Sequence, residues 1–114
     1  MSSVNWHEVR DALTQLSDRE LQLRLWLSDG SGGSDVSSFA EAVEQLFTDT
    51  GLSCELKDNG TGLGAEVDEL FRLMEQEILK VNTQSGPLHT INDPAMVNVR
   101  SIAIRLLERL PRTT

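Results

Sequence analysis

The segment LQLRLWLS at residues 21–28 decides which fold the chain can adopt. Leucine occupies every second position from Leu21 to Leu27, which is the period of a strand with one leucine face. The segment nevertheless contains no β-branched residue, and Leu, Gln and Arg are all good helix formers. On a helix, Leu21 would pair with Leu25 and Leu23 with Leu27, giving two apolar flanks. We therefore predict a helix over residues 18–28.

A strand over residues 21–28 is the alternative prediction, and it would make the chain a small α+β domain. The only segment that could pair with this strand is a short run near Leu52 to Leu56. An isolated two-stranded ribbon is only marginally stable in water. The sequence therefore favours an all-α fold.

Four further segments repeat apolar residues at intervals of three and four, which is the pattern of amphipathic helices. Asn5 precedes the first of them as a capping residue, and Asp93 with Pro94 begins the last. The predicted helices span residues 5–16, 36–49, 63–82 and 94–110. With the helix at 18–28 they form a compact bundle of about five helices.

The predicted helices are connected by two segments rich in Gly, Ser, Asn and Asp, at about residues 28–35 and 57–64. Such a composition is typical of flexible loops. With 114 residues, the chain is long enough for one hydrophobic core and too short for two. We therefore predict a single globular domain over residues 1–114.

The predicted helix at 94–110 is apolar around most of its circumference. A helix of this kind either lies at the centre of the bundle or contributes part of its surface to a second subunit. The sequence therefore leaves two alternatives for this helix: a central position, or a homodimer interface.

Charge is unevenly distributed along the chain. Of its 10 basic and 18 acidic residues, four arginines and one glutamate lie in residues 95–114. Residues 1–94 therefore hold 6 basic and 17 acidic residues, a net charge of −11, against +3 for the remainder. The total of −8 argues against binding to nucleic acid or to anionic membranes, and it suits a protein partner, in particular a basic one.

Localisation is predicted from what the sequence lacks. Residues 1–10 have neither the basic nor the apolar region of a signal peptide, and no apolar run approaches the roughly 20 residues that span a bilayer. We expect a cytoplasmic protein. The single cysteine, Cys54, cannot form an internal disulfide, and we expect it to be a small buried residue.

Three features of the sequence are candidates for protein binding. Trp26 would be an interface anchor if it pointed away from the core, although core packing is the simpler expectation. The acidic residues of the 63–82 helix could face a basic partner if they share one exposed surface; they are Glu66, Asp68, Glu69, Glu75 and Glu77. Arg105 and Arg109 serve either an interface or, as we prefer, internal ion pairs.

No motif in the sequence predicts catalysis, a metal site or a cofactor. The only histidines, His7 and His89, lie far apart in the sequence and do not form a ligand-spaced set with Cys54. The glycine-rich segment at 58–64 lacks the lysine of a phosphate-binding loop and the ligand pattern of a calcium loop. We therefore predict no catalytic activity.

The combined prediction is a small, acidic, cytoplasmic protein-interaction module. One alternative is an immunity-type or inhibitor protein that blocks a basic nuclease or another nucleic-acid-binding surface. A further alternative is an enzyme or small-ligand binder that uses Cys54 or His89 in a pocket between helices.

Overall fold

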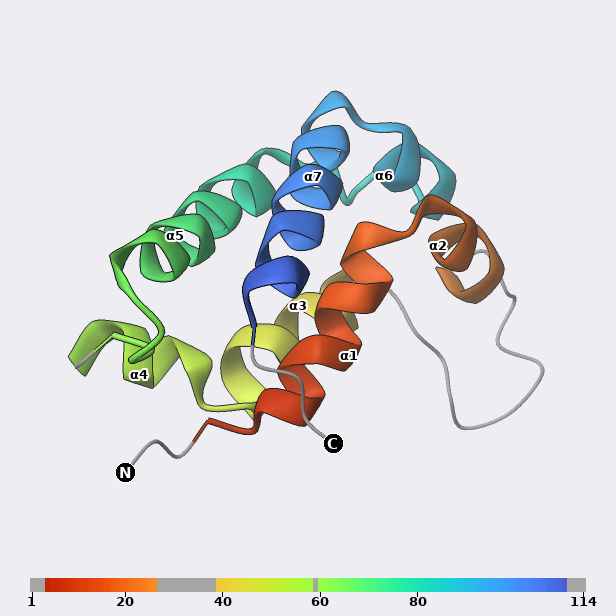
Figure 1. The fold of residues 1–114 in the computed structure, drawn as a ribbon. Helices are drawn as coiled ribbons and strands as arrows, with labels where there is room; N and C mark the ends of the chain where they lie inside the picture. Colours follow the sequence, from red (N-terminus) through yellow and green to blue (C-terminus); the bar gives the residue numbers. More distant parts are fainter. Residues whose placement is uncertain (1–3, 27–38, 59, 111–114) are drawn as a thin grey trace.

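The computed structural model describes residues 4–26, 39–58 and 60–110, and every regular element within these ranges is a helix (Figure 1). The all-α prediction is therefore confirmed. The elements are α1 (Trp6–Ser17), α2 (Arg19–Trp26), α3 (Phe39–Glu44), a π-helix η1 (Gln45–Asp49), α4 (Leu52–Asp58), α5 (Ala65–Lys80), α6 (Pro87–Asn92) and α7 (Pro94–Arg109).

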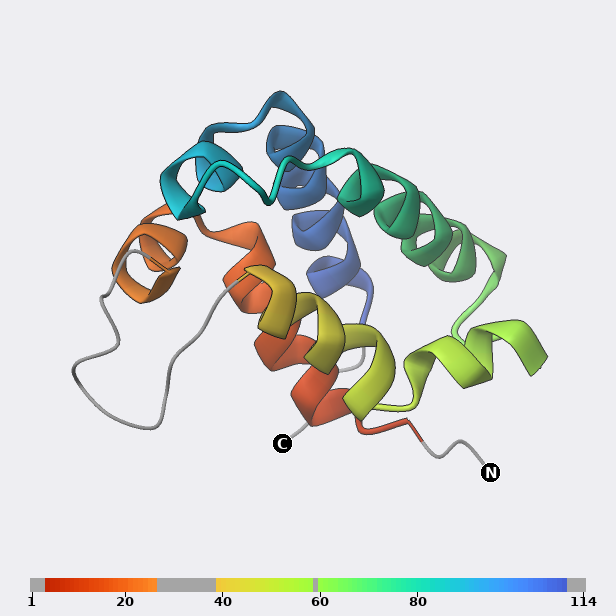
Figure 2. The ribbon, with the colours of Figure 1, turned by 180° about the vertical axis from the view of Figure 1, so that it is seen from behind.

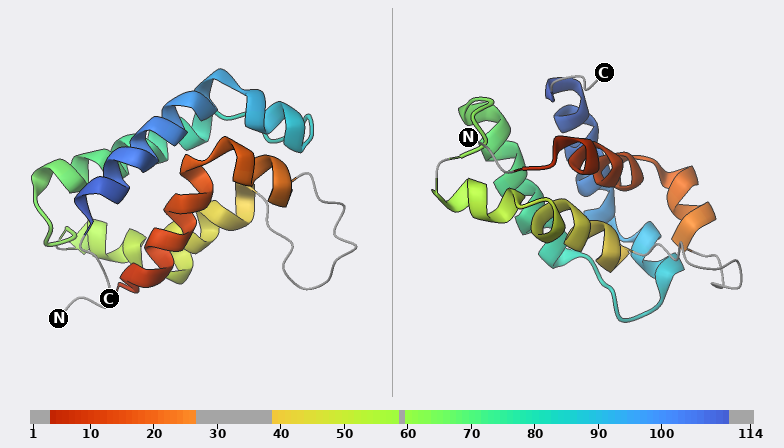
Figure 3. Two further views of the ribbon diagram at one scale, coloured as in Figure 1. Left: turned by 45° about the vertical axis from the view of Figure 1, so that its right-hand side comes forward. Right: turned by 90° about the horizontal axis from the view of Figure 1, so that it is seen from below.

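Helix α7 lies between α5 and α1, as Figures 1 and 2 both show. Figure 3 shows α5 and α7 side by side, with α1 and α3 on the other side of the molecule. The buried residues of α7 cover two sides of the helix: Ala95, Met96, Val99, Ile102, Ala103 and Leu106. Phe47 of η1 and Phe71 of α5 close the core between the two sides, with their rings in an edge-to-face contact at 6.5 Å. The central position, one of the two alternatives that the sequence left open for this helix, is thus observed.

The ambiguous segment LQLRLWLS forms helix α2 as far as Trp26, and its last two residues lie outside the described part. The Asp18 carboxylate begins the helix, because its Oδ1 accepts hydrogen bonds from the backbone N–H groups of Glu20 and Leu21. The buried side chains of this short helix are Gln22 and Trp26, whereas its leucines are only half-buried. The helix prediction was right, but the buried positions were not the leucines.

A buried polar network holds α2 in place. The side chain of Gln22 is fully buried, and its Nε2 donates to the backbone oxygens of Gln15 and Leu16 at 2.9 and 3.0 Å. These are carbonyl groups of the last turn of α1, which has no partner for them within the helix. Arg100 of α7 donates from Nη1 to Gln22 Oε1 and to the backbone oxygen of Ile91, each at 3.1 Å. One amide and one guanidinium therefore join α1, α2, α6 and α7.

Arginines also connect the two short helices at this end of the molecule. Arg19 of α2 donates from Nη2 to Asn92 Oδ1 of α6 at 2.9 Å. Burial, followed by the positive charge of Arg19, lowers the pKa of Arg100. The position of α2 thus depends on specific hydrogen bonds as well as on apolar packing.

Two short helices were not predicted. Residues 52–58 form α4, where Leu52 and Leu56 are buried one turn apart, so this run is not a strand and the loop expected from 57 begins later. Residues 87–92 form α6, which begins at Pro87, a residue that is favourable at the first position of a helix. Neither helix reaches eight residues, and periodicity is weak evidence over so short a length.

The turn before α5 is closed by a carboxylate. Asp68 Oδ1 accepts from the backbone N–H and the Oγ1 of Thr61, at 2.9 and 2.6 Å. Gly60 has a φ of +75°, and a Cβ at this position would collide with Asp68 Oδ2. Gly62 has a φ of +79° and open space around its Cα. The Asp68 carboxylate is therefore occupied by hydrogen bonds within the fold. Position 60 requires a glycine, because its φ is positive and because a Cβ there would collide with Asp68.

We expect Gln22→Ala to lower the free energy of unfolding by about 1–3 kcal/mol, because the carbonyl groups of α1 and the Arg100 guanidinium lose a buried partner. Gln76→Ala, at an exposed position of α5, is the matched control and should change stability by less than about 0.5 kcal/mol. Urea denaturation of both variants measures the difference. Equal stability of the two variants would contradict the structural role of the network.

We expect Gly60→Ala to destabilise the fold more than Gly62→Ala. Both glycines have nearly the same positive φ, so both variants carry the same backbone strain of about 1 kcal/mol. Only the Gly60 variant adds a collision with Asp68. The thermal unfolding midpoints of the two variants should differ, and a Gly62→Ala midpoint as low as that of Gly60→Ala would be inconsistent with the Asp68 contact.

Candidate functional site

Trp26 is not an exposed anchor. Its side chain is only 5% exposed, and its ring lies edge-to-face against Phe39 with centroids 5.8 Å apart. Its Nε1 donates to Gln15 Oε1 at 3.3 Å. The proposed binding role of Trp26 is therefore corrected: the residue packs in the core, and its one polar atom has a partner there.

The acidic residues of α5 do not share one exposed surface. Glu66 pairs with Arg109, and Asp68 closes the preceding turn. Glu77 is 9% exposed and accepts from Lys80 at 2.8 Å and from Asn98 at 2.7 Å. These three carboxylates are bound within the molecule, which corrects the expectation of an acidic binding face on this helix.

The other two carboxylates of α5, Glu69 and Glu75, are exposed and have no hydrogen bond or ion pair with the described residues. They are six positions apart, so they project about 120° from each other around the helix axis. A flat basic surface could not contact both at once through the same side of α5.

Arg105 and Arg109 differ in their surroundings. Arg109 forms an ion pair with Glu66, which confirms the internal ion pair predicted for this residue. Its Nη1 also donates to the backbone oxygen of Arg105. Exposed pairs of this kind contribute roughly 0–1 kcal/mol to stability. The side chain of Arg105 forms no ion pair with the described residues and borders a shallow groove of about 300 Å³ between α5 and α7, with Leu73 and Ile102 on its walls.

Cys54 and His89 lie on different helices and are both exposed, which corrects the expectation of a buried cysteine. His89 borders a hollow of about 440 Å³ formed by the 82–94 region, together with Asn82 and Leu88. Cys54 does not line it. The described residues contain no group of three or more His, Cys, Asp or Glu side chains placed to hold a metal ion.

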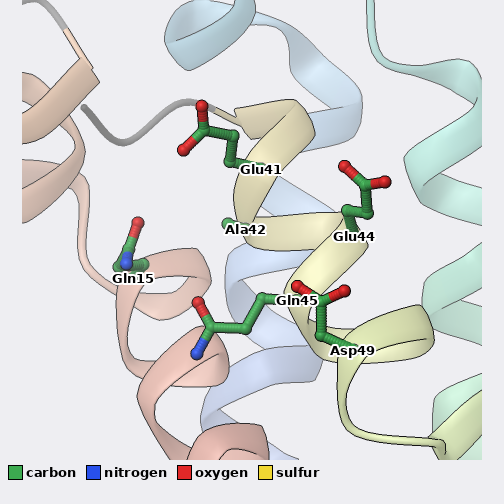
Figure 4. Close-up of a pocket in the computed structure, with 6 residues that line it drawn as sticks. All are labelled: Gln15, Glu41, Ala42, Glu44, Gln45 and Asp49. Carbon is green, nitrogen blue, oxygen red and sulfur yellow. The ribbon is translucent and has the colours of Figure 1, made fainter. Parts of the chain in front are cut away.

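A pocket of about 340 Å³ lies between α1 and the α3–η1 segment, and it was not predicted from the sequence (Figure 4). Among the described residues that line it there are three carboxylates and no lysine or arginine. The lining residues are Gln15, Glu41, Ala42, Glu44, Gln45 and Asp49. We call this the acidic pocket.

The acidic pocket follows from the amphipathic character of α3 and η1. Phe39, Ala42, Leu46 and Phe47 are buried, so the polar residues between them must face outward. The predicted helix at 36–49 included this apolar face, and its polar face could have been recognised from the same pattern.

The π-helical turn decides how the carboxylates are spaced. In a π-helix the backbone bonds join residues i and i+5, so residues five apart come closer around the axis than in an α-helix. Glu44 and Asp49 are five apart and follow one another along the same side of the ribbon (Figure 4). Thr50 Oγ1 closes the turn by donating to the backbone oxygen of Leu46 at 2.6 Å.

The two amide side chains of the pocket are held by hydrogen bonds within the molecule, whereas two of its carboxylates have no such partner. Gln45 Nε2 donates to the backbone oxygen of Glu8 at 3.2 Å, and Gln15 Oε1 accepts from Trp26. Glu44 and Asp49 have no hydrogen bond or ion pair within the described residues. Carboxylate oxygens without an internal partner can accept hydrogen bonds from a guanidinium or an ammonium group.

Stability should depend on pH through Glu77. Hydrogen bonds from Lys80 and then Asn98 hold the pKa of Glu77 below its ordinary value of 4.5. The ionised form is favoured by folding, so its contribution is present above pH 4.5 and is lost as the pH falls through the lower folded-state pKa.

We expect Glu77→Gln to lose less stability than the wild type between neutral pH and about pH 3. Glu75→Gln, an exposed change on the same helix, should lose as much as the wild type. Urea midpoints at the two pH values measure this. An unchanged acid dependence in Glu77→Gln would rule out the proposed linkage.

In the described part of the chain, the helices are all too short or too polar to cross a bilayer. Comparison of the sequence and structure with protein-family models, curated proteins and solved structures finds no match.

Proposed function

We propose that the chain is a protein-interaction module that binds a basic protein partner through the acidic pocket. The observation that carries this proposal is that Glu44 and Asp49 both line the acidic pocket and have no hydrogen-bond or ion-pair partner among the described residues. Glu66, Asp68 and Glu77, by contrast, are paired within the fold, and Glu69 and Glu75 are exposed but do not line a pocket. The expected partner group is an arginine or lysine side chain.

The physical basis of binding is charge complementarity in a partly enclosed site. An arginine can donate two parallel hydrogen bonds to a carboxylate, and such charge-assisted bonds are roughly twice as strong as neutral ones. The fixed amides of Gln15 and Gln45 on the α1 side keep the walls of the pocket in place before a partner arrives. The net charge of −8 adds long-range attraction for a basic protein and accelerates the encounter.

The inhibitor form of the hypothesis rests on the same pocket. A nuclease or another nucleic-acid-binding protein presents lysine and arginine at its phosphate-binding surface. The acidic pocket replaces α5 as the expected contact because Glu69 and Glu75 project in different directions. A cytoplasmic location and the absence of catalytic activity remain predictions from the sequence.

The experiment compares two variants that remove the same charge. Tagged wild-type protein and the variants Glu44→Gln/Asp49→Asn and Glu69→Gln/Glu75→Gln are recovered from their native cells, and the partner recovered in near-equal amount is identified. The affinity of each protein for the purified partner is then measured. We expect at least tenfold weaker binding by Glu44→Gln/Asp49→Asn, about 1.4 kcal/mol, and near wild-type binding by the α5 variant.

Ionic strength provides an independent measurement. Binding through the acidic pocket should weaken as salt rises, because salt screens exposed charges over about 10 Å at 0.1 M. Wild-type affinity in Glu44→Gln/Asp49→Asn would refute the pocket as the contact. Loss of binding only in Glu69→Gln/Glu75→Gln would move the contact to α5.

A further inference from the structure

Two arginines lie where α2, α6 and α7 meet (Figures 1 and 3). Arg19 of α2 donates from Nη2 to Asn92 Oδ1 at 2.9 Å, and Arg100 of α7 donates from Nη1 to the backbone oxygen of Ile91 at 3.1 Å. Ile91 and Asn92 are successive residues of α6, so the two guanidiniums bind neighbouring acceptors. Burial, followed by the positive charge of Arg19, lowers the pKa of Arg100, as expected when two cations are brought together.

Neither of these arginines is paired with a carboxylate. Among the described residues, no acidic side chain lies within ion-pair distance of Arg19 or Arg100. The nearest acids along the chain are used elsewhere or exposed: Asp18 and Asp93 accept hydrogen bonds from backbone N–H groups, and Glu20 points to solvent. Two like charges therefore stand together without an anion, in a chain that has 18 acidic residues.

Both guanidiniums have donors left over. A guanidinium carries five N–H groups on three nitrogens, and each of these two uses a single nitrogen. Nε and Nη1 of Arg19 and Nε and Nη2 of Arg100 have no hydrogen-bond partner among the described residues. Arg19 is exposed, and the free nitrogens of Arg100 reach solvent, because the one buried unpartnered side-chain atom on the non-exposed residues described belongs to Arg10.

We propose that Arg19 and Arg100 form a binding site for a phosphate group, which accepts hydrogen bonds from the free nitrogens of both guanidiniums. Their other hydrogen bonds, to Asn92, Ile91 and Gln22, hold the two side chains in place before the ligand arrives. The planar fork of an arginine matches the oxygens of a phosphate group, and charge-assisted bonds of this kind are the strong ones.

A phosphate group fits this pair better than a carboxylate does. A phosphate monoester carries a charge of about −1.5 to −2 at pH 7 and three acceptor oxygens, so it balances both guanidiniums. A carboxylate brings a single charge. Free phosphate and the monoester of a small molecule share this chemistry, and the experiment below separates them.

The net charge of −8 still permits an anion at this position. At physiological ionic strength, charges are screened over about 8 Å, so the groups beside the ligand dominate its binding. The acidic pocket is lined by residues of α1, α3 and η1, and none of these elements contributes a side chain to the arginine pair.

The test is an NMR titration of the isotope-labelled full chain with sodium phosphate, glycerol phosphate and sodium acetate, each compared with sodium chloride at equal ionic strength. We expect the Nε–H signals of Arg19 and Arg100 to shift with phosphate and to saturate, with a dissociation constant on the order of 1 mM. Acetate should bind at least tenfold more weakly. Saturation by both phosphate compounds would assign the site to monoesters, and saturation by inorganic phosphate alone would assign it to the free ion.

Two variants that remove the same charge complete the test. Arg19→Gln should raise the dissociation constant for phosphate at least tenfold. Arg24→Gln is the matched control, because Arg24 is exposed on the same helix, five positions further on, and projects about 140° away; it should leave the constant unchanged. Backbone amide spectra verify that both variants keep the wild-type fold.

Three results would overturn the proposal: shifts that sodium chloride reproduces, acetate binding as tight as that of phosphate, or phosphate binding that Arg19→Gln does not weaken. The site is independent of the basic partner proposed above. Glu44→Gln/Asp49→Asn should still bind phosphate, and Arg19→Gln should still bind the basic partner, so the two proposals succeed or fail separately.

Discussion

The fold depends on burying two sides of α7 at once. Its apolar residues point toward α5 on one side and toward α1 on the other, so neither neighbour alone could remove them from water. This constraint fixes the order α5, α7, α1 across the molecule, and the α3–η1 segment then covers the remaining apolar side of α1. The outward side of the same helix is left with Val97 and Ile104 exposed.

Buried hydrogen bonds, in addition to apolar packing, fix the position of α2. Helix α2 has only eight residues and would be marginal by itself in water. The fully buried amide of Gln22 satisfies carbonyl groups of α1 and receives Arg100, which also reaches the backbone of α6. Burying such groups is costly unless every partner is present, so this network specifies one position for α2 rather than a range of equivalent ones.

The carboxylates of α5 differ from those of α3 and η1 in how many have partners within the fold. Three acidic residues of α5 have partners within the fold. Glu66 pairs with Arg109, and Asp68 accepts from Thr61. Glu77 accepts from Lys80 and Asn98. On α3 and η1, Glu44 and Asp49 line a pocket and are exposed to solvent. A count of acidic residues in the sequence therefore did not show which carboxylates have partners within the fold.

The sequence by itself determined the helical class, because the three-and-four spacing of apolar residues and the capping residues Asn5 and Asp93 are local properties of the chain. For the helix at 94–110 the sequence left two alternatives, a central position or a homodimer interface, and the structure shows it packed between α5 and α1. Only the tertiary structure decided that α4 and α6 are helical, that Trp26 is buried and that Glu66 pairs with Arg109, as these depend on contacts between distant segments. The acidic pocket belongs to the same group: the polar face of the 36–49 segment is readable from the sequence, but Gln15 lies far from this segment in the chain and joins it in the pocket only through the packing of α1 against α3 and η1.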